Sequence, residues 1–308
     1  MSDSSPLIAG VELGGTKAVA LIARDSRTID SVRVPTSRAA DTLGAIAARI
    51  GAWVGEHGPI AALGVASFGP LQLDPRAANY GCITRTTKPG WSGTDVLSPF
   101  AGLVSGPTGF DTDVAGAAMA ETLWGAGRDQ GVVVYLTVGT GIGGGLVVDG
   151  RPVHGSVHPE MGHLRVRRTP GDAFAGVCPF HGDCLEGLAS GPAIAARAGA
   201  PAETLAADHP VWTLVADELA ELAVSLILTL SPDRILIGGG VAGGQPFLFP
   251  MIRAATAEKL GGYVEGLDAG RLESMIAAPE LGDRAGPLGA VALGIIAMRH
   301  GQGSRPAR

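Results

Sequence analysis

Two glycine-rich turns, far apart in the sequence, have the composition of phosphate-binding loops. The first reads Glu12-Leu13-Gly14-Gly15-Thr16-Lys17, and the second spans residues 137–145 and contains Gly139-Thr140-Gly141. Glycine lets backbone N–H groups approach phosphate oxygens, threonine adds a hydroxyl donor, and Lys17 adds a positive charge. Neither turn fits the Walker pattern or opens a βαβ unit, so each alone could be an ordinary tight hairpin. Together with a third glycine run, Gly238-Gly239-Gly240, they predict two hairpins that bind one polyphosphate from two domains.

A second group of residues has the spacing of a metal site. Cys178, His181 and Cys184 are separated from one another by two residues each, and His163 precedes them. Two thiolates and two imidazoles form a ligand set typical of tetrahedral Zn²⁺. Four protein ligands leave no open coordination position, so the pattern predicts a structural zinc ion that holds a loop in place. The alternative is a chance grouping of a surface histidine and two buried cysteines.

Two further histidines and the number of cysteines bear on alternative metal ligands and on disulfide bonds. His154 and His158 lie near this group and compete as ligands, but they have no matching partners and we interpret them as loop residues. Three cysteines are too few for a disulfide framework, which favours a reducing compartment.

Carboxylates form the third group. Asp111 and Asp113 lie at a predicted helix start, Glu160 precedes His163, and Glu186 follows the last cysteine. Their distribution around the predicted zinc loop suggests a polar pocket. An Asp at a helix N-terminus is often only a cap for free backbone N–H groups, and Glu186 alone could be a surface charge.

The elements that must position these residues alternate between strand and helix patterns. Each phosphate turn joins two short apolar runs, which predicts two antiparallel hairpins and an internal duplication. Apolar residues at helical spacing or in short continuous runs predict the remaining elements of a layered α/β protein. The predicted strands are residues 7–13, 18–22, 32–34, 61–66, 102–105, 132–138, 146–148 and 234–237, and the predicted helices are 39–53, 113–124, 211–230, 246–260 and 287–299.

Composition narrows the class of protein. The 308 residues, 46% hydrophobic and 17% charged, favour two domains. A net charge of −6 offers no basic stripe for nucleic acid, so we expect no nucleic-acid partner. No leader-like start and no long uninterrupted apolar run are present, so we expect a cytoplasmic protein without a membrane partner.

The combined motifs resemble the ROK sugar kinases, a branch of the actin-like, hexokinase-type ATPases. The resemblance extends over nearly the whole chain and includes both phosphate turns, the run Leu236-Ile237-Gly238-Gly239-Gly240-Val241 and the segment from Pro159-Glu160-Met161-Gly162-His163 to Ser190-Gly191. It implies a two-domain α/β fold of the actin-like (hexokinase/ribonuclease H-like) type with a catalytic cleft. We expect an N-terminal domain at 1–115, with a helix at about 289–300 packed back on it, and a C-terminal domain at 116–288 that carries the zinc loop. A homodimer is also implied.

The resemblance assigns roles residue by residue. Asp113 matches the catalytic aspartate, and His163 matches a residue that contacts sugar and also holds zinc. The expected ligands of the kinase are ATP, Mg²⁺ with the nucleotide, structural Zn²⁺ and a sugar. The implied sugar contacts are Gly69, Thr112, Asp113, Glu160, His163 and Glu186; the nucleotide contacts are Gly14, Gly15, Thr16, Lys17, Gly139, Thr140, Gly141, Gly238, Gly239 and Gly240; and the zinc ligands are His163, Cys178, His181 and Cys184.

Within the family, three segments resemble the bacterial fructokinases: Phe68-Gly69-Pro70, residues 80–91 and the Cys-Pro-Phe-His-Gly-Asp-Cys loop. They imply phosphorylation of D-fructose at its 6-hydroxyl. Thr112 stands where many members have asparagine, and Ala115-Gly116 where an asparagine is frequent, so a kinase for glucose, mannose or an amino sugar is the alternative. A non-catalytic sugar sensor or repressor is a further one, although residues 1–7 are too few for the helix-turn-helix segment of such proteins.

Overall fold

The computed structural model describes residues 5–302, whose contacts separate into two compact units. The first unit contains the residues up to Trp124, Pro152–His158 and the residues from Asp283 onward. The second unit contains Gly125–Arg151 and Pro159–Gly282. The first boundary falls after Trp124 instead of the expected residue 115, because the whole of helix α2 (Asp113–Trp124) packs with elements of the first unit. The last segment of the first unit begins at Asp283, whereas the sequence predicted that the C-terminal domain extends to residue 288.

The first unit is built on a five-stranded sheet in the order β3-β2-β1-β4-β5. β1 and β2 form the antiparallel hairpin that the first glycine turn predicted, with Leu13 opposite Ala18. β4 is parallel to β1 and to β5, so the chain crosses over between them. The strands are β1 (Ile8–Leu13), β2 (Lys17–Arg24), β3 (Arg27–Pro35), β4 (Ala62–Ser67) and β5 (Thr108–Thr112).

The strand predicted at residues 102–105 was wrong. These residues form turns and a bend, and the strand begins at Thr108. Gly102 has a φ of +75°, which a β-strand does not accept. Leu103 and Val104 pack against the core from this turn, so their apolar character comes from packing and not from a strand.

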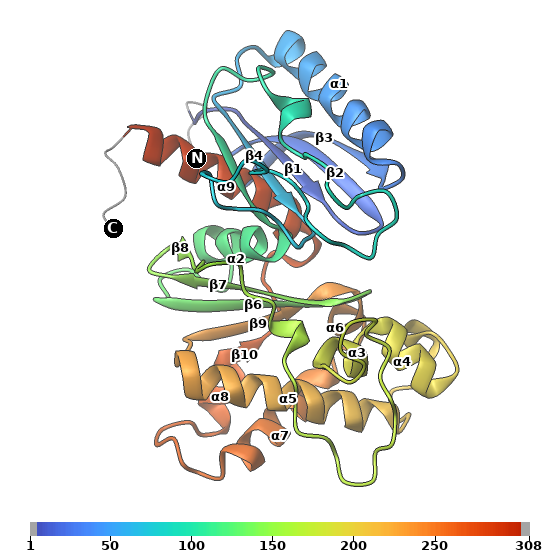
Figure 1. Cartoon of the computed structure of the whole chain (residues 1–308). Helices are drawn as coiled ribbons and strands as arrows, with labels where there is room; N and C mark the ends of the chain where they lie inside the picture. Colours follow the sequence, from blue (N-terminus) through green and yellow to red (C-terminus); the bar gives the residue numbers. More distant parts are fainter. Residues whose placement is uncertain (1–4, 303–308) are drawn as a thin grey trace. The chain divides into compact units, whose positions relative to one another are not determined.

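Helices cover both faces of this sheet (Figure 1). α1 (Ala39–His57) buries Leu43, Ile46, Ile50 and Trp53, whose spacing places them on one face of the helix. α2 and α9 (Ala285–Gln302) pack against each other, and α9 also lies on β1, β4 and β5. A Cβ atom on Gly64 would lie 1.8 Å from the carbonyl oxygen of Ala290, so only glycine lets α9 approach β4 this closely. A short 3₁₀ helix, η1 (Ser98–Phe100), completes the unit.

The second unit also has a five-stranded sheet, in the order β10-β9-β6-β7-β8. β6 and β7 form the second hairpin, and β9 runs parallel to β6. β7 begins at Ile142, four residues before the predicted strand, because Gly143, Gly144 and Gly145 pair regularly with β6 despite the low strand propensity of glycine. The strands are β6 (Val132–Val138), β7 (Ile142–Val148), β8 (Arg151–Pro152), β9 (Arg234–Gly238) and β10 (Ile276–Ala277).

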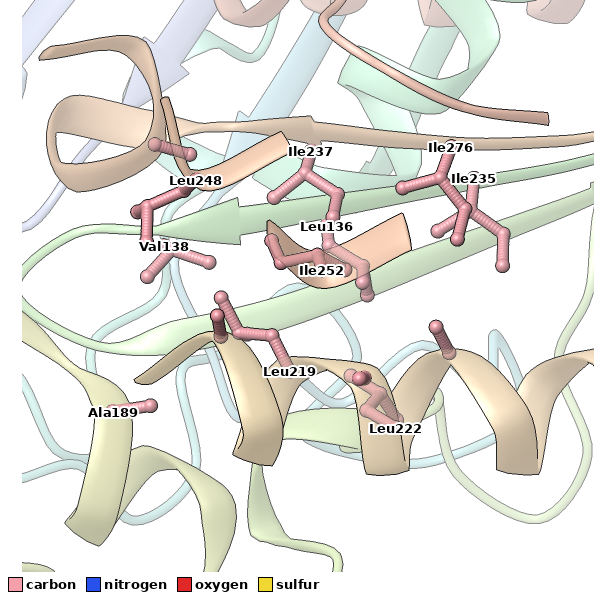
Figure 2. Close-up of a cluster of buried hydrophobic side chains, with 14 of the residues drawn as sticks. Leu136, Val138, Ala189, Leu219, Leu222, Ile235, Ile237, Leu248, Ile252 and Ile276 are labelled. Atoms are coloured by element: carbon pink, nitrogen blue, oxygen red, sulfur yellow. The ribbon is translucent and has the colours of Figure 1, made fainter. Parts of the chain in front are cut away.

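Apolar helices complete the core of the second unit. Figure 2 shows side chains of β6 and β9, such as Leu136 and Ile237, gathered with Leu219 and Leu222 of α5 and with Ile252 of α7. Burying one such side chain contributes about 1.5–3 kcal/mol to folding. The helices are α3 (Leu185–Ala189), α4 (Gly191–Ala198), α5 (Val211–Leu230), α6 (Gly239–Gly244), α7 (Leu248–Leu260) and α8 (Ala269–Met275), with 3₁₀ turns η2 (Met161–His163), η3 (Ala202–Thr204) and η4 (Gly282–Arg284). Across residues 5–302, no helix has both the length and the apolar character needed to cross a membrane.

Candidate active site

Asp113 is the first residue of α2, directly after β5. The helix is capped by its neighbour: the Thr112 hydroxyl oxygen accepts a hydrogen bond from the Ala115 N–H at 3.1 Å. The Asp113 carboxylate accepts a hydrogen bond from the adjacent Val114 N–H at 2.9 Å. The residue that caps the helix is therefore Thr112. Asp113 is half-buried at the end of the sheet and is a candidate base.

Asp111 lies two residues earlier on β5, and it is bound to a histidine that the sequence did not connect with it. The carboxylate is 3% exposed, accepts a bond from the Thr112 N–H at 2.7 Å, and lies 3.0 Å from His154 Nε2. This bond raises the pKa of His154 above its ordinary value, because the nearby carboxylate favours the imidazolium.

The second loop histidine fixes another part of the first unit. His158 Nε2 accepts a hydrogen bond from the Leu71 N–H at 3.0 Å, and its ring lies beside Gly69, a predicted sugar contact. His154 and His158 thus lie in a loop outside the metal group, as expected, and from this loop they contact other segments of the first unit. Sequence separations of 43 and 87 residues from their partners gave no local signal for either contact.

Glu12, the first residue of the first phosphate motif, has an unusual electrostatic environment. Its pKa is raised from 4.5 to about 7, chiefly by burial and next by the nearby Asp113 carboxylate, whereas Lys17 and Arg33 act to lower it. The folded protein therefore holds a proton on Glu12 at a pH where the unfolded chain has released it.

Glu12→Gln is expected to become more stable relative to wild type as the pH rises. Because the folded-state pKa lies above the unfolded value, wild-type stability falls between pH 4.5 and about 7. The difference in free energy of unfolding between variant and wild type should shift by about 2–3 kcal/mol toward the variant from pH 5 to pH 8. Urea unfolding at both pH values measures it, with the exposed Glu203→Gln as control. A difference independent of pH would contradict the assignment.

The second phosphate turn joins three predicted site segments in the second unit. The Gly139 N–H bonds to the Gly141 carbonyl at 2.9 Å, and the Gly191 N–H bonds to the Gly139 carbonyl at 2.7 Å. Glu186 Oε2 accepts a bond from the Ile142 N–H at 3.0 Å, at the end of the same turn. Residues 238–240 lie beside it, because Thr137 pairs with Gly238 between β6 and β9.

His163 and Glu186 are both electrostatic neighbours of Glu160 in the second unit. Burial raises the pKa of Glu160; the Glu186 carboxylate raises it further and His163 lowers it. The 3₁₀ turn that follows Glu160 packs directly on β7: a Cβ atom on Gly162 would lie 1.8 Å from the Ile142 carbonyl oxygen. Glycine at this position lets Glu160 and His163 lie next to the second turn.

The four predicted metal ligands lie together, with their ligand atoms all within 4.8 Å of one another. Cys184 Sγ lies 3.5 Å from His163 Nδ1, and Cys178 Sγ lies 3.7 Å from His181 Nδ1 and 3.8 Å from His163 Nδ1. A tetrahedral Zn²⁺ with bonds of about 2.3 Å to sulfur and about 2.0 Å to nitrogen places these atoms about 3.5 Å apart. The donor set and its spacing therefore fit zinc.

The local backbone holds this cluster in a tight loop. Cys178 and Gly182 exchange backbone hydrogen bonds of 3.2 and 2.9 Å, and the Leu185 N–H bonds to the Leu164 carbonyl at 2.9 Å. Burial raises the pKa of the Cys184 thiol to about 11, so this thiol keeps its proton until a cation displaces it.

Comparison with known proteins identifies the family. A model described as the ROK family matches residues 8–296. The chain belongs to the ROK family. The fructokinase of Zymomonas mobilis is 43% identical to this ROK protein over 302 residues, covering 96% of the chain and 99% of that relative.

Two crystal structures share the fold of this ROK protein. A ROK hexokinase from Thermus thermophilus is 26% identical with a TM-score of 0.77, and 95% of the chain and 99% of that structure are covered. A ROK family glucokinase from Streptomyces griseus, in complex with glucose and AMPPNP, is 25% identical with a TM-score of 0.73 and coverage of 94% and 99%. The predicted membership in the family and the predicted actin-like, hexokinase-type α/β class are confirmed.

Within each unit, the structure groups the predicted residues of this ROK protein. In the first unit, the strand ends that carry the first turn and Thr112 lie on either side of β4 in the sheet, Gly69 follows β4, and Asp113 follows Thr112. The second unit contains the second turn, the group of two cysteines and two histidines, and the Glu160–His163–Glu186 set. Sequence reasoning missed Asp111 with His154, and also Thr36 and Lys88, which bind the first turn. The contacts of all four residues join segments that are distant in the sequence.

Proposed function

We propose that this ROK protein is a fructokinase, which transfers the γ-phosphoryl group of ATP to D-fructose and forms fructose 6-phosphate. The observation that carries the proposal is 43% identity to a fructokinase over nearly the full length of both chains. The AMPPNP complex of the glucokinase relative supports ATP as the phosphoryl donor.

Asp113 acts as the general base in the proposed reaction. Its carboxylate takes the proton of the sugar hydroxyl while that oxygen attacks the γ-phosphorus, and the bond from the γ-phosphorus to the bridging oxygen breaks to release ADP. The position of Asp113 supports this role, because Thr112 caps α2 and Asp113 is not needed for that purpose.

Backbone amides bind the phosphate groups. The two glycine turns, with Lys17 at the first and Gly238-Gly239-Gly240 beside the second, supply N–H donors and a positive charge. Mg²⁺ bound with the nucleotide neutralises negative charge on the phosphoryl oxygens.

Glu160, His163 and Glu186 bind sugar hydroxyls, and Gly69 and Thr112 line the sugar site. Glu186 uses one carboxylate oxygen for the Ile142 N–H, which orients the side chain and leaves the other oxygen for a hydroxyl. We propose that His163, Cys178, His181 and Cys184 hold a structural Zn²⁺ that fixes the loop around His163. If His163 held the metal through Nδ1, it would carry its proton on Nε2 and could donate it in a hydrogen bond to a sugar hydroxyl.

ADP release from MgATP, measured in parallel on fructose, mannose, glucose and N-acetylmannosamine, tests the substrate. We expect kcat/KM on fructose to exceed that on the other sugars by about tenfold or more, since a pocket that pairs with particular hydroxyls rejects sugars that lack them. Preference for another hexose would keep the mechanism and overturn the substrate. No turnover on any sugar would favour a sugar sensor.

The homodimer implied by the family resemblance is also part of this proposal. Light scattering coupled to size-exclusion chromatography measures the mass directly, and a mass of one chain at micromolar concentration would contradict it.

A further inference from the structure

The first phosphate turn has all of its carbonyl groups occupied by the protein itself. The three residues between β1 and β2, together with Lys17 at the start of β2, each present a carbonyl oxygen, and each oxygen accepts a hydrogen bond within the first unit. The bonds are Thr36 Oγ1 to Gly14 O at 2.7 Å, Lys88 Nζ to Gly15 O at 2.6 Å, the Thr36 N–H to Thr16 O at 3.0 Å, and the Gly14 N–H to Lys17 O at 3.1 Å.

The N–H groups of the same turn are in the opposite situation. Gly15 and Thr16 are exposed, and within residues 5–302 their N–H groups have no hydrogen-bond partner. In a planar trans peptide the N–H points away from the C=O. The bond from Thr36 to Gly14 O therefore turns the Gly15 N–H outward, and the bond from Lys88 to Gly15 O does the same for the Thr16 N–H. Successive outward N–H groups form an anion-binding nest.

Both anchoring residues are held in place by neighbouring structure. Thr36 directly follows β3 and is 8% exposed. Lys88 lies in a loop that ends at Trp91, a fully buried side chain whose Nε1–H donates to the Ser37 carbonyl at 2.8 Å. This bond fixes the loop of Lys88 next to residue 36, so the two anchors reach the turn from adjacent positions.

We propose that Thr36 and Lys88 are positioning residues for the polyphosphate of the nucleotide, which hold the carbonyls of the first turn inward so that the Gly15 and Thr16 N–H groups face the phosphates. The inference rests on the proposed kinase function. A carbonyl oxygen turned toward a phosphate would repel it. Each anchor holds one carbonyl of the turn away from the phosphates before the nucleotide binds, and so prevents this repulsion. The Lys88 ammonium also adds positive charge beside the turn.

Calorimetric binding of MgAMPPNP, without sugar, tests the proposal independently of turnover. For Lys88→Met we expect a Kd about tenfold or more above wild type, because the variant loses one charge-assisted hydrogen bond. For Thr36→Val we expect a rise in Kd of about threefold to tenfold. Lys88→Arg and Thr36→Ser, which keep the donors, should recover most of the affinity. Arg38→Met is the matched control, because it removes an exposed positive charge from the same unit.

Steady-state kinetics separate positioning from general damage. KM for MgATP should rise in Lys88→Met and Thr36→Val while KM for fructose and the melting temperature stay close to wild type. Wild-type nucleotide affinity in either variant overturns the assignment for that residue, and an equal loss in Arg38→Met overturns it for Lys88. If wild-type protein binds MgAMPPNP but phosphorylates no hexose, the proposed function fails while the binding test of the turn still stands.

Discussion

Asp113→Asn is expected to lower kcat by about 10²–10⁴-fold, the usual contribution of a general base. Asparagine keeps the shape of the side chain and can still accept the bond from the Val114 N–H, but it cannot take a proton from a sugar hydroxyl. Thr112 continues to cap α2, so the fold should be unaffected. Initial rates with MgATP and fructose, together with direct fructose binding, measure the effect.

The matched control is Asp41→Asn, an exposed acid in the first turn of α1 that makes the same chemical change at a comparable helix position. It should retain wild-type kcat. Asp113→Asn should bind fructose within about threefold of wild type, since a base acts in the transition state and contributes little to ground-state binding. Turnover of Asp113→Asn above about a tenth of wild type would sink the assignment of the base.

Cys178→Ser is expected to lose the proposed zinc ion and a large part of the stability of the second unit. Removing one of four ligands from a site whose binding energy is also folding energy should lower the melting temperature by about 10 °C or more. Because His163 shares the cluster with Cys178, KM for fructose should rise about tenfold as the histidine loses its orientation. Metal analysis, differential scanning calorimetry and kinetics measure the three effects.

Cys82→Ser is the control for this variant. Cys82 is a half-exposed free thiol outside the cluster, so its replacement should leave zinc content, stability and KM unchanged. Wild-type protein purified without zinc and fully active, or Cys178→Ser with wild-type metal content, would contradict the zinc assignment.

Much of the fold follows from local pattern. The apolar runs on either side of the first glycine turn predicted the hairpin of β1 and β2, and the periodic apolar residues at 211–230 predicted the whole of α5. Local pattern gave a wrong prediction at residues 102–105, where the apolar residues of a turn have the composition of a strand. It also missed residues 143–145, where glycines form a strand because residues of β6 pair with them. In both places packing with distant residues overrides the preference of the segment.

In the candidate site, too, some features follow from local sequence and others depend on contacts between distant residues. The groups that carry chemistry could be recognised from the sequence alone. Two thiols and two imidazoles at short spacing, glycine turns with threonine and lysine, and an Asp at a helix start are all local features. The folded structure was needed to show that Thr112 caps α2 in place of Asp113 and that Glu186 holds the second turn. It was also needed to show that Thr36 and Lys88 hold the first turn. Lys88 lies 73 residues from Gly15, and no spacing rule connects them. The physical reason is that a side chain's type limits which bonds it can make, whereas the folded chain decides which partner comes within about 3 Å of it.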